Sequence, residues 1–297
     1  MAKVKPAWLL LSLVLFFITV SCKHSASGIP ESDKETMDAY WRQGKAEITS
    51  YRLTKSEDGK MDTGSVVLIF NIAYISKKYG NPLSELKKHP GDAMEVLKCN
   101  MITEFSGINE FDMMSSTYNP LAYGQYPHCI KLTASSQDWS DQTFLQMQWK
   151  DYRYETHLYP PPEAKDDKEI ILINTWLEDE IWNKIRLTPH QLPLGETEMV
   201  PATLYTQLSN TLLKVHKAEA SIKELENSFE YSISYPELKR TISIGFEKGF
   251  PYKILSWKET IDNKETITAT ALKTIQSDYW NLTNNEDKSI RDSLHIR

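Results

Sequence analysis

The chain has 297 residues and a formal net charge of −6, with 40% hydrophobic and 11% aromatic residues. This length suits one large domain or two small ones. The acidic balance excludes the basic surface that nucleic-acid-binding proteins need, and it argues against a broad electrostatic attraction to anionic lipid headgroups.

The first 21 residues predict a secretory signal peptide. Lys3 and Lys5 precede an apolar run from Ala7 to Val20. This run of about 14 residues is shorter than the roughly 20 that a membrane-spanning helix needs, but it suits the apolar core of a signal peptide. We therefore expect export from the cytoplasm.

The end of this run, Thr19-Val20-Ser21-Cys22, resembles a bacterial lipobox, in which the cysteine is diacylated and becomes the new N-terminus. Thr19 stands where the lipobox usually has leucine, and an ordinary cleaved signal is the alternative. The resemblance implies that Cys22 is lipidated and joins the chain to the membrane. Because Lys23 rather than aspartate follows, it also implies the outer membrane. No acidic cluster follows directly, so we expect the periplasmic face.

The remaining chain divides by composition. We expect a lipidated N-terminus and tether over residues 22–38, a single β-rich domain over 39–282 and a polar tail over 283–297. Three consecutive prolines begin a polar stretch at 160–168, which marks a possible subdivision, since proline cannot continue a sheet.

Strands dominate the first half of the domain. Runs rich in β-branched and aromatic residues, separated by turn residues, are typical of strands. The six predicted strands cover residues 45–56, 63–76, 93–105, 111–121, 128–139 and 142–159.

The second half predicts a four-stranded antiparallel meander over residues 228–276. Its first strand places Phe229, Tyr231, Ile233 and Tyr235 on one face, as the period of two requires. Residues 211–224 fit either an amphipathic helix or a strand and turn.

Helical patterns are few. A short helix is expected within residues 81–90. A clearer one is expected within 175–187, where the apolar residues at helical spacing are Trp176, Ile181, Trp182 and Ile185. The predicted fold is mainly β: one large curved antiparallel sheet, a half-barrel-like meander, wrapping one or two short helices. A two-sheet sandwich is the alternative.

Cysteine and histidine residues predict neither a disulfide nor a metal site. Cys99 and Cys129 fall two strands apart, about 10 Å, which is too far to bridge, so free buried thiols are favoured over a disulfide. No two histidines lie three or four places apart, and we expect no metal or other cofactor.

One turn and several aromatic residues are candidates for ligand binding. Gln137, Asp138 and Trp139 begin a turn that offers amides, carboxylates and an indole, a mixture that suits a sugar. Trp149, Tyr154 and Trp257 lie on predicted strands, where they could line a concave face. The alternative is that all six side chains serve only turn and core packing.

The segments "YWRQGKAEITSYRL", "SSQDWSDQTFLQ" and "EIWNKIR" resemble a group of Bacteroidota lipoproteins often mislabelled "septum formation inhibitor". Relatives tend to have Cys-Gly where this chain has Ser140-Asp141. The label implies a cytoplasmic nucleotide pyrophosphatase with a Ser-x-Ser-x-Arg-Arg motif, and the chain has no such motif. We therefore expect no enzymatic activity.

Two functional hypotheses follow. The first is a lipid-anchored periplasmic binding module that holds an amphiphile or acyl chain in envelope traffic. The second is a structural or interaction lipoprotein that docks an envelope protein complex. A glycan hydrolase that uses Asp138 and Asp141 is a more distant alternative.

Overall fold

The computed structural model describes Ile29 and residues 31–57, 60–84, 88–105, 111–122, 126–140, 142–159, 168–209, 211–282, 284 and 289–295. The predicted signal peptide, Cys22, Asp141 and the three prolines at 160–162 lie outside these residues, so the predictions made for them stay predictions.

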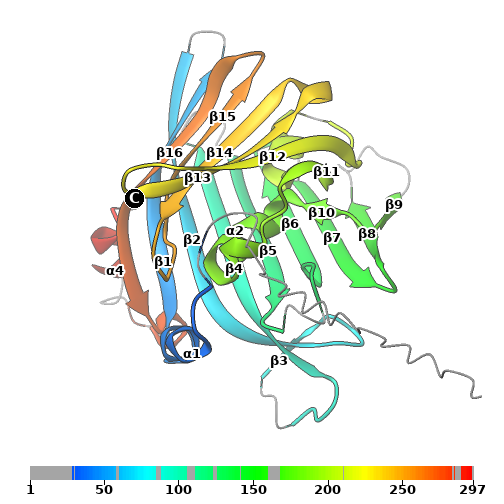
Figure 1. Cartoon of the computed structure of the whole chain (residues 1–297), viewed down its shortest axis with the longest axis vertical. Coiled ribbons are helices and arrows are strands. Elements are labelled where there is room, and N and C mark those ends of the chain that lie inside the picture. The colour runs from blue at the N-terminus through cyan, green and yellow to red at the C-terminus, as the bar shows by residue number, and fades with distance from the viewer. Residues whose placement is uncertain are drawn as a thin grey trace, which may run out of the picture.

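Strands make up most of the described chain (Figure 1). In chain order they are β1 (Ala46–Glu57), β2 (Lys60–Ser76), β3 (Pro82–Leu83), β4 (Ala93–Phe105), β5 (Phe111–Pro120), β6 (Lys131–Gln137), β7 (Gln142–Lys150), β8 (Arg153–Tyr159), β9 (Lys168–Ile173), β10 (Trp176–Leu177), β11 (Gly195–Val200), β12 (His216–Glu224), β13 (Ser228–Tyr235), β14 (Arg240–Glu247), β15 (Ile254–Ile261) and β16 (Lys264–Ser277).

The helices are short. They are α1 (Lys34–Trp41), α2 (Ile181–Leu187), α3 (Thr203–Leu208) and α4 (Ser289–Ser293), together with 3-10 turns at Glu178–Glu180, Pro189–Gln191, Pro236–Leu238 and Tyr279–Asn281. No helix in the described part of the chain is long and apolar enough to cross a membrane.

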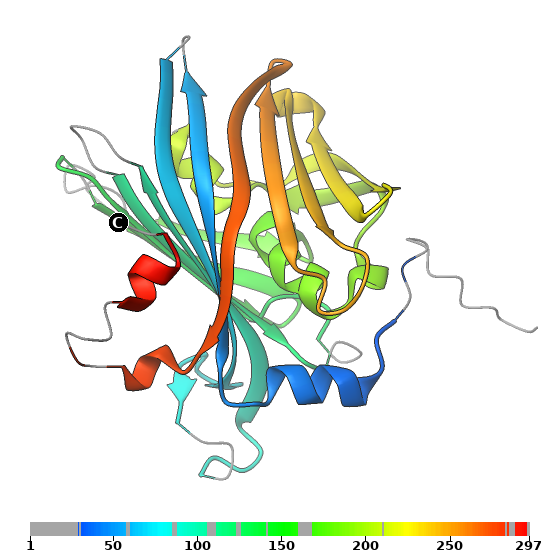
Figure 2. The ribbon, with the colours of Figure 1, turned by 90° about the vertical axis from the view of Figure 1, so that its left-hand side faces the viewer.

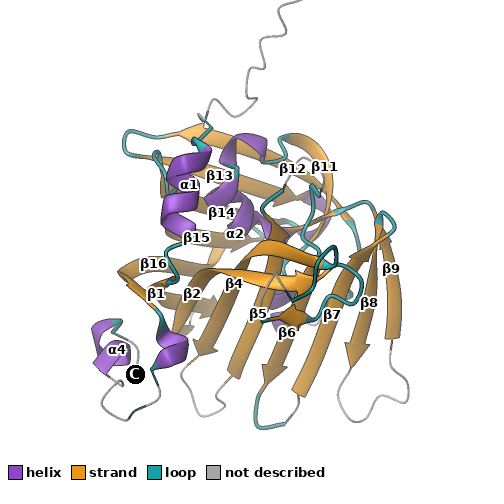
Figure 3. Cartoon of the chain, turned by 90° about the horizontal axis from the view of Figure 1, so that it is seen from below, coloured by secondary structure: helices purple, strands orange, loops and turns teal. Residues whose placement is uncertain are grey.

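All the strands belong to one sheet, which confirms the predicted curved meander; the sandwich alternative is wrong. The strand order is β10-β11-β12-β13-β14-β15-β16-β1-β2-β4-β5-β6-β7-β8-β9, with β3 paired to β2. Neighbours pair antiparallel except β10 and β11. The two ends of this order, β9 and β10, follow each other in the chain, so the sheet curls almost into a barrel around α2 (Figures 1 and 3).

The inner face of the sheet carries the main core. The meander was predicted correctly: Phe229, Tyr231, Ile233 and Tyr235 on β13 are all buried, and their polar neighbours alternate with them. Aromatic side chains of β1, β2, β14 and β15 join them around α2. Cys99 and Cys129 are free and buried, as expected.

The helix predicted at 175–187 begins later than its spacing indicated. Trp176 and Leu177 form a strand because they pair with Met199 and Val200 of β11. A 3-10 turn follows, and α2 starts only at Ile181. All seven residues of α2 are buried, so the segment is enclosed rather than amphipathic.

Two other predicted elements were wrong. The strand over 142–159 is the hairpin β7–β8, because Asp151 and Tyr152 take positive φ angles of 50° and 63° and form a tight two-residue turn. In the described part of 81–90 there is no helix; Pro82 and Leu83 extend the sheet beside β2 instead.

The sequence did not decide the secondary structure of residues 211–224, and the two ends of the domain are more ordered than it indicated. The ambiguous segment 211–224 contains β12, whose residues His216, Ala218 and Ala220 point inward. The predicted tether is already helical from Lys34, because Asp33 caps α1 through the Thr36 amide, 2.8 Å away. At the other end Leu294 is buried against the outer face of β1 and β2, so this described part of the predicted tail packs on the sheet.

Candidate functional site

The aromatic residues predicted to line a concave cavity are core residues instead. Trp257 is only 6% exposed, and its ring centroid lies 4.8 Å from that of Tyr51 and 5.0 Å from that of Trp182. Tyr154 is fully buried, and its hydroxyl donates to the Cys129 carbonyl oxygen at 2.8 Å. Trp149 is half-buried beside the Tyr154 ring, at 4.9 Å. The interior of the curved sheet is therefore packed at these positions.

Charged side chains fill much of the remaining interior. Arg240 on β14 is buried and donates to both oxygens of Glu178, at 2.6 and 2.8 Å, and to Glu259 at 2.5 Å. The Tyr235 hydroxyl also donates to Glu178. The guanidinium lies 4.3 Å from the centroid of the Tyr205 ring. These contacts fasten the turn before α2 to β13, β14 and β15.

A second buried ion pair fastens the other end of α2. Arg186 donates to both carboxylate oxygens of Glu47 on β1, at 2.5 and 2.7 Å, and to the Pro251 carbonyl oxygen at 2.8 Å. Its guanidinium also stacks on the rings of Trp41 and Phe70. Bidentate geometry of this kind is the strongest arrangement for a buried pair.

Glu180 binds the segment to the opposite wall. It accepts hydrogen bonds from the amides of Cys129 and Leu177, at 2.6 and 3.1 Å, and lies 3.2 Å from Nδ1 of His128. The charged side chains of residues 178–186 thus pair with both halves of the sheet. We interpret this segment as a structural plug, since its charged groups are engaged by the protein itself.

Asp179 gives the plug a pH dependence that can be tested. Burial raises its pKa to about 6, although two hydrogen bonds from Thr203 oppose that shift. Because the folded-state pKa exceeds the usual 3.8, the stability that protonation confers is complete below about pH 4 and is lost as the pH rises through 6. The difference corresponds to about 3 kcal/mol.

Asp179→Asn should therefore gain stability relative to the wild type, by up to about 3 kcal/mol, as the pH rises from 4 to 7. Urea unfolding of both proteins across that range measures the change. Asp92→Asn is the control, because hydrogen bonds from Ser76 and Lys78 lower the pKa of Asp92. Its titration therefore lies below about pH 4, and the difference in stability between Asp92→Asn and the wild type should stay nearly constant from pH 4 to 7. A constant difference between wild type and Asp179→Asn would contradict the assignment.

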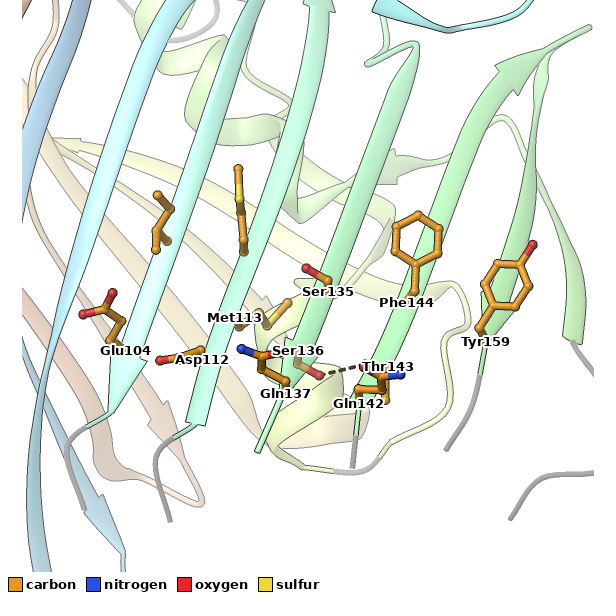
Figure 4. Close-up of a pocket in the computed structure, with 12 residues that line it drawn as sticks. Glu104, Asp112, Met113, Ser135, Ser136, Gln137, Gln142, Thr143, Phe144 and Tyr159 are labelled. Carbon is orange, nitrogen blue, oxygen red and sulfur yellow. Dashed lines mark hydrogen bonds between the residues drawn. The ribbon is translucent and has the colours of Figure 1, made fainter. Parts of the chain in front are cut away.

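A depression of about 530 Å³ lies on the outer face of β4 to β8 (Figure 4). Its floor is a lateral row of residues that are cross-strand partners, one from each strand. We call it the aromatic row: Ile102, Met114, Ser135, Phe144 and Tyr159. Along β6 and β7 the alternate residues Ala134 and Leu145 point into the core, so the row faces solvent. The Phe144 and Tyr159 ring centroids are 5.7 Å apart.

A second row borders the first toward the strand ends. This polar row consists of cross-strand partners Glu104, Asp112, Gln137 and Gln142. Ser65 donates to Glu104 at 3.5 Å, whereas the side chains of Asp112, Gln137 and Gln142 have no hydrogen-bond partner among the described residues. Beneath them, on the inner face, Ser136 and Thr143 bond to each other at 2.7 Å.

The structure thus separates the six residues that the sequence proposed for one ligand site. Gln137 lies in the outer depression, and Asp138 and Trp139 lie in the adjoining turn. Trp139 is 74% exposed, while Asp138 accepts from the Ser140 amide at 2.7 Å, which is the predicted turn role. Trp149, Tyr154 and Trp257 belong to the interior.

The sequence prediction missed the aromatic row and both carboxylates of the polar row. The alternation of β6 and β7 places Ser135, Gln137 and Phe144 on one face, but only the pairing register brings Met114 and Tyr159 beside them. Within the described ranges no cluster of three His, Cys, Asp or Glu side chains could hold a metal ion. The groups present in the depression are suited to binding: rings, hydrogen-bonding amides and carboxylates.

Comparisons with known proteins show the fold alone. No family model and no curated protein matches the sequence. The structure is similar to the crystal structure of a β-barrel-like protein of the domain of unknown function DUF1849 from Brucella abortus. The TM-score is 0.50 and the identity 11%, over 78% of this chain and 98% of that one.

Proposed function

We propose that this protein is a lipid-anchored binding module of the bacterial envelope, attached through Cys22 to the periplasmic face of the outer membrane. Its ligand lies in the outer depression of β4 to β8, not inside the curved sheet. The observation that carries the proposal is the contrast between the two faces: the inner face is packed around the plug, whereas the outer face offers exposed rings beside polar groups that have no partner among the described residues.

The position of the depression supports this arrangement. The chain enters the domain through α1, at the end of the sheet opposite the β1–β2 turn (Figure 2). The polar row lies at the other end, because Glu104 and Asp112 flank the β4–β5 turn. The thirteen residues of β4 span about 40 Å. An anchor before α1 would thus leave the depression accessible on the far side of the domain.

Holding a long acyl chain inside the sheet is disfavoured by the same packing. The interior volume that such a chain would need is occupied by the buried side chains of Tyr154, Trp257 and α2. An amphiphile would have to bind on the outer face. We assign the protein no catalytic activity, in keeping with its resemblance to uncharacterised envelope lipoproteins.

The anchor is tested by labelling cells that express the full chain with radioactive palmitate. We expect label in the wild type and none in Cys22→Ala, which should also leave the membrane fraction, since each buried methylene contributes about 0.8 kcal/mol. Cys99→Ala is the control and should stay labelled, because burial raises the pKa of that thiol and keeps it unreactive. Label that persists in Cys22→Ala would disprove the anchor.

A further inference from the structure

The depression has the chemistry of a carbohydrate site, and we infer that its ligand is a neutral saccharide chain. This inference rests on the proposed function and names the class of ligand for the same depression. It starts from the two rows, which run side by side across β4 to β7. The aromatic row continues to β8 and spans about 19 Å.

The spacing of the rows matches the two sides of a sugar ring. Each polar-row residue is two positions along its strand from an aromatic-row residue, which is about 7 Å. The aliphatic face of a pyranose can stack on Phe144 and Tyr159 while its hydroxyl groups reach the polar row. Gln137 and Gln142 both donate and accept hydrogen bonds, and Glu104 and Asp112 accept them. Hydroxyl groups satisfy both kinds of partner.

The charges in the depression disfavour anionic ligands. Glu104 and Asp112 are direct cross-strand partners, and no lysine or arginine is among the described residues that line the depression. A phosphate headgroup or an acidic polysaccharide would therefore be repelled. An acyl chain would cover the polar row without satisfying it, at a cost for each buried polar group.

An extended peptide fits less well than a saccharide. The backbones of β5, β6 and β7 are paired on both sides, so the sheet offers no free edge in the depression. A bound peptide would have to bury backbone amides and carbonyls without the ladder that peptide-binding sheets provide. A cationic peptide remains the main competitor because of the two carboxylates.

The inference is tested by isothermal titration of the full chain with cellotetraose, maltotetraose and chitotetraose. We expect at least one to bind, and Phe144→Ala or Tyr159→Ala to weaken binding roughly tenfold or more. Tyr79→Ala is the matched control: this ring is also exposed, but it lies on the turn after β2, outside the depression, and its removal should change nothing. Raising the ionic strength should also leave the affinity unchanged, because the ligand is neutral.

Tetralysine, a cationic peptide, and dodecylphosphocholine, an amphiphile, serve as competing probes. Preferential binding of either one, or the absence of tetrasaccharide binding up to about 1 mM, would overturn the saccharide inference. Equal binding by wild type and the double variant Phe144→Ala, Tyr159→Ala would do the same.

A cross-linking experiment separates this failure from failure of the proposed function. A photoreactive phenylalanine replaces Met114, which is 37% exposed in the aromatic row, or Tyr79 as the control, in the full chain in cells. A saccharide adduct specific to position 114 supports both proposals. A specific lipid or protein adduct there retains the binding module but rejects the saccharide, and no specific adduct rejects both.

Discussion

Arg240→Met is expected to lower the free energy of unfolding by about 3–5 kcal/mol. The substitution keeps most of the side-chain volume but leaves two buried carboxylates, Glu178 and Glu259, without their cation. Burial already raises the pKa of Glu259 in the wild type, against the pull of Arg240. Without Arg240 that pKa should rise further, so the loss of stability should shrink in mild acid. Urea unfolding at pH 5 and pH 7 measures both effects.

Lys248→Met provides the control for this variant. Lys248 pairs with Glu224 at 2.6 Å on the surface, where such a pair contributes at most about 1 kcal/mol. If Arg240→Met lost no more stability than Lys248→Met, the buried ion pairs of Arg240 would not hold the plug in place. The interior of the sheet would then be a possible ligand site.

Trp257→Ala is expected to lower the free energy of unfolding by about 3–5 kcal/mol, because it leaves a cavity between Tyr51 and Trp182. Tetrasaccharide affinity should stay as in the wild type, since the indole belongs to the interior. Chemical unfolding and titration of the same preparation measure the two quantities.

Trp280→Ala is the matched control. Trp280 is half-exposed beside Tyr279, so its removal should lower the free energy of unfolding only slightly. If Trp257→Ala kept its stability but lost tetrasaccharide affinity, Trp257 would be a ligand-binding residue, as the sequence analysis predicted.

The sheet could be predicted from local pattern because one face of most strands is buried. The alternation on β13 and the turn residues around it determine the meander, and one continuous sheet follows from the short connections. The β7–β8 turn was missed because Asp151 and Tyr152 adopt positive φ without a glycine to mark it. Two strands therefore looked like one long strand.

The plug could not be predicted, because its partners are remote in the chain. Arg186 meets Glu47 across 139 positions, and Arg240 meets Glu178 across 62. With acidic and basic residues between its apolar positions, the segment has the pattern of a solvated helix. Only the closed curve of the sheet makes those charges buried and paired.

The outer depression depends on register in the same way. Phe144 and Tyr159 come together only because a two-residue turn joins β7 and β8. A shift of one residue would move either ring to the opposite face. The sequence located part of this site at Gln137 but attributed the aromatic contribution to residues of the core.

The most direct test is methyl NMR of methionine-labelled full chain during titration with whichever of the three tetrasaccharides binds, and with dodecylphosphocholine. Met114 lies in the aromatic row, whereas Met147 and Met199 are fully buried on the inner face. We predict that this tetrasaccharide shifts the Met114 resonance and leaves those of Met147 and Met199 unchanged. A probe that shifted Met147 or Met199 and spared Met114 would place the ligand inside the sheet and contradict the account.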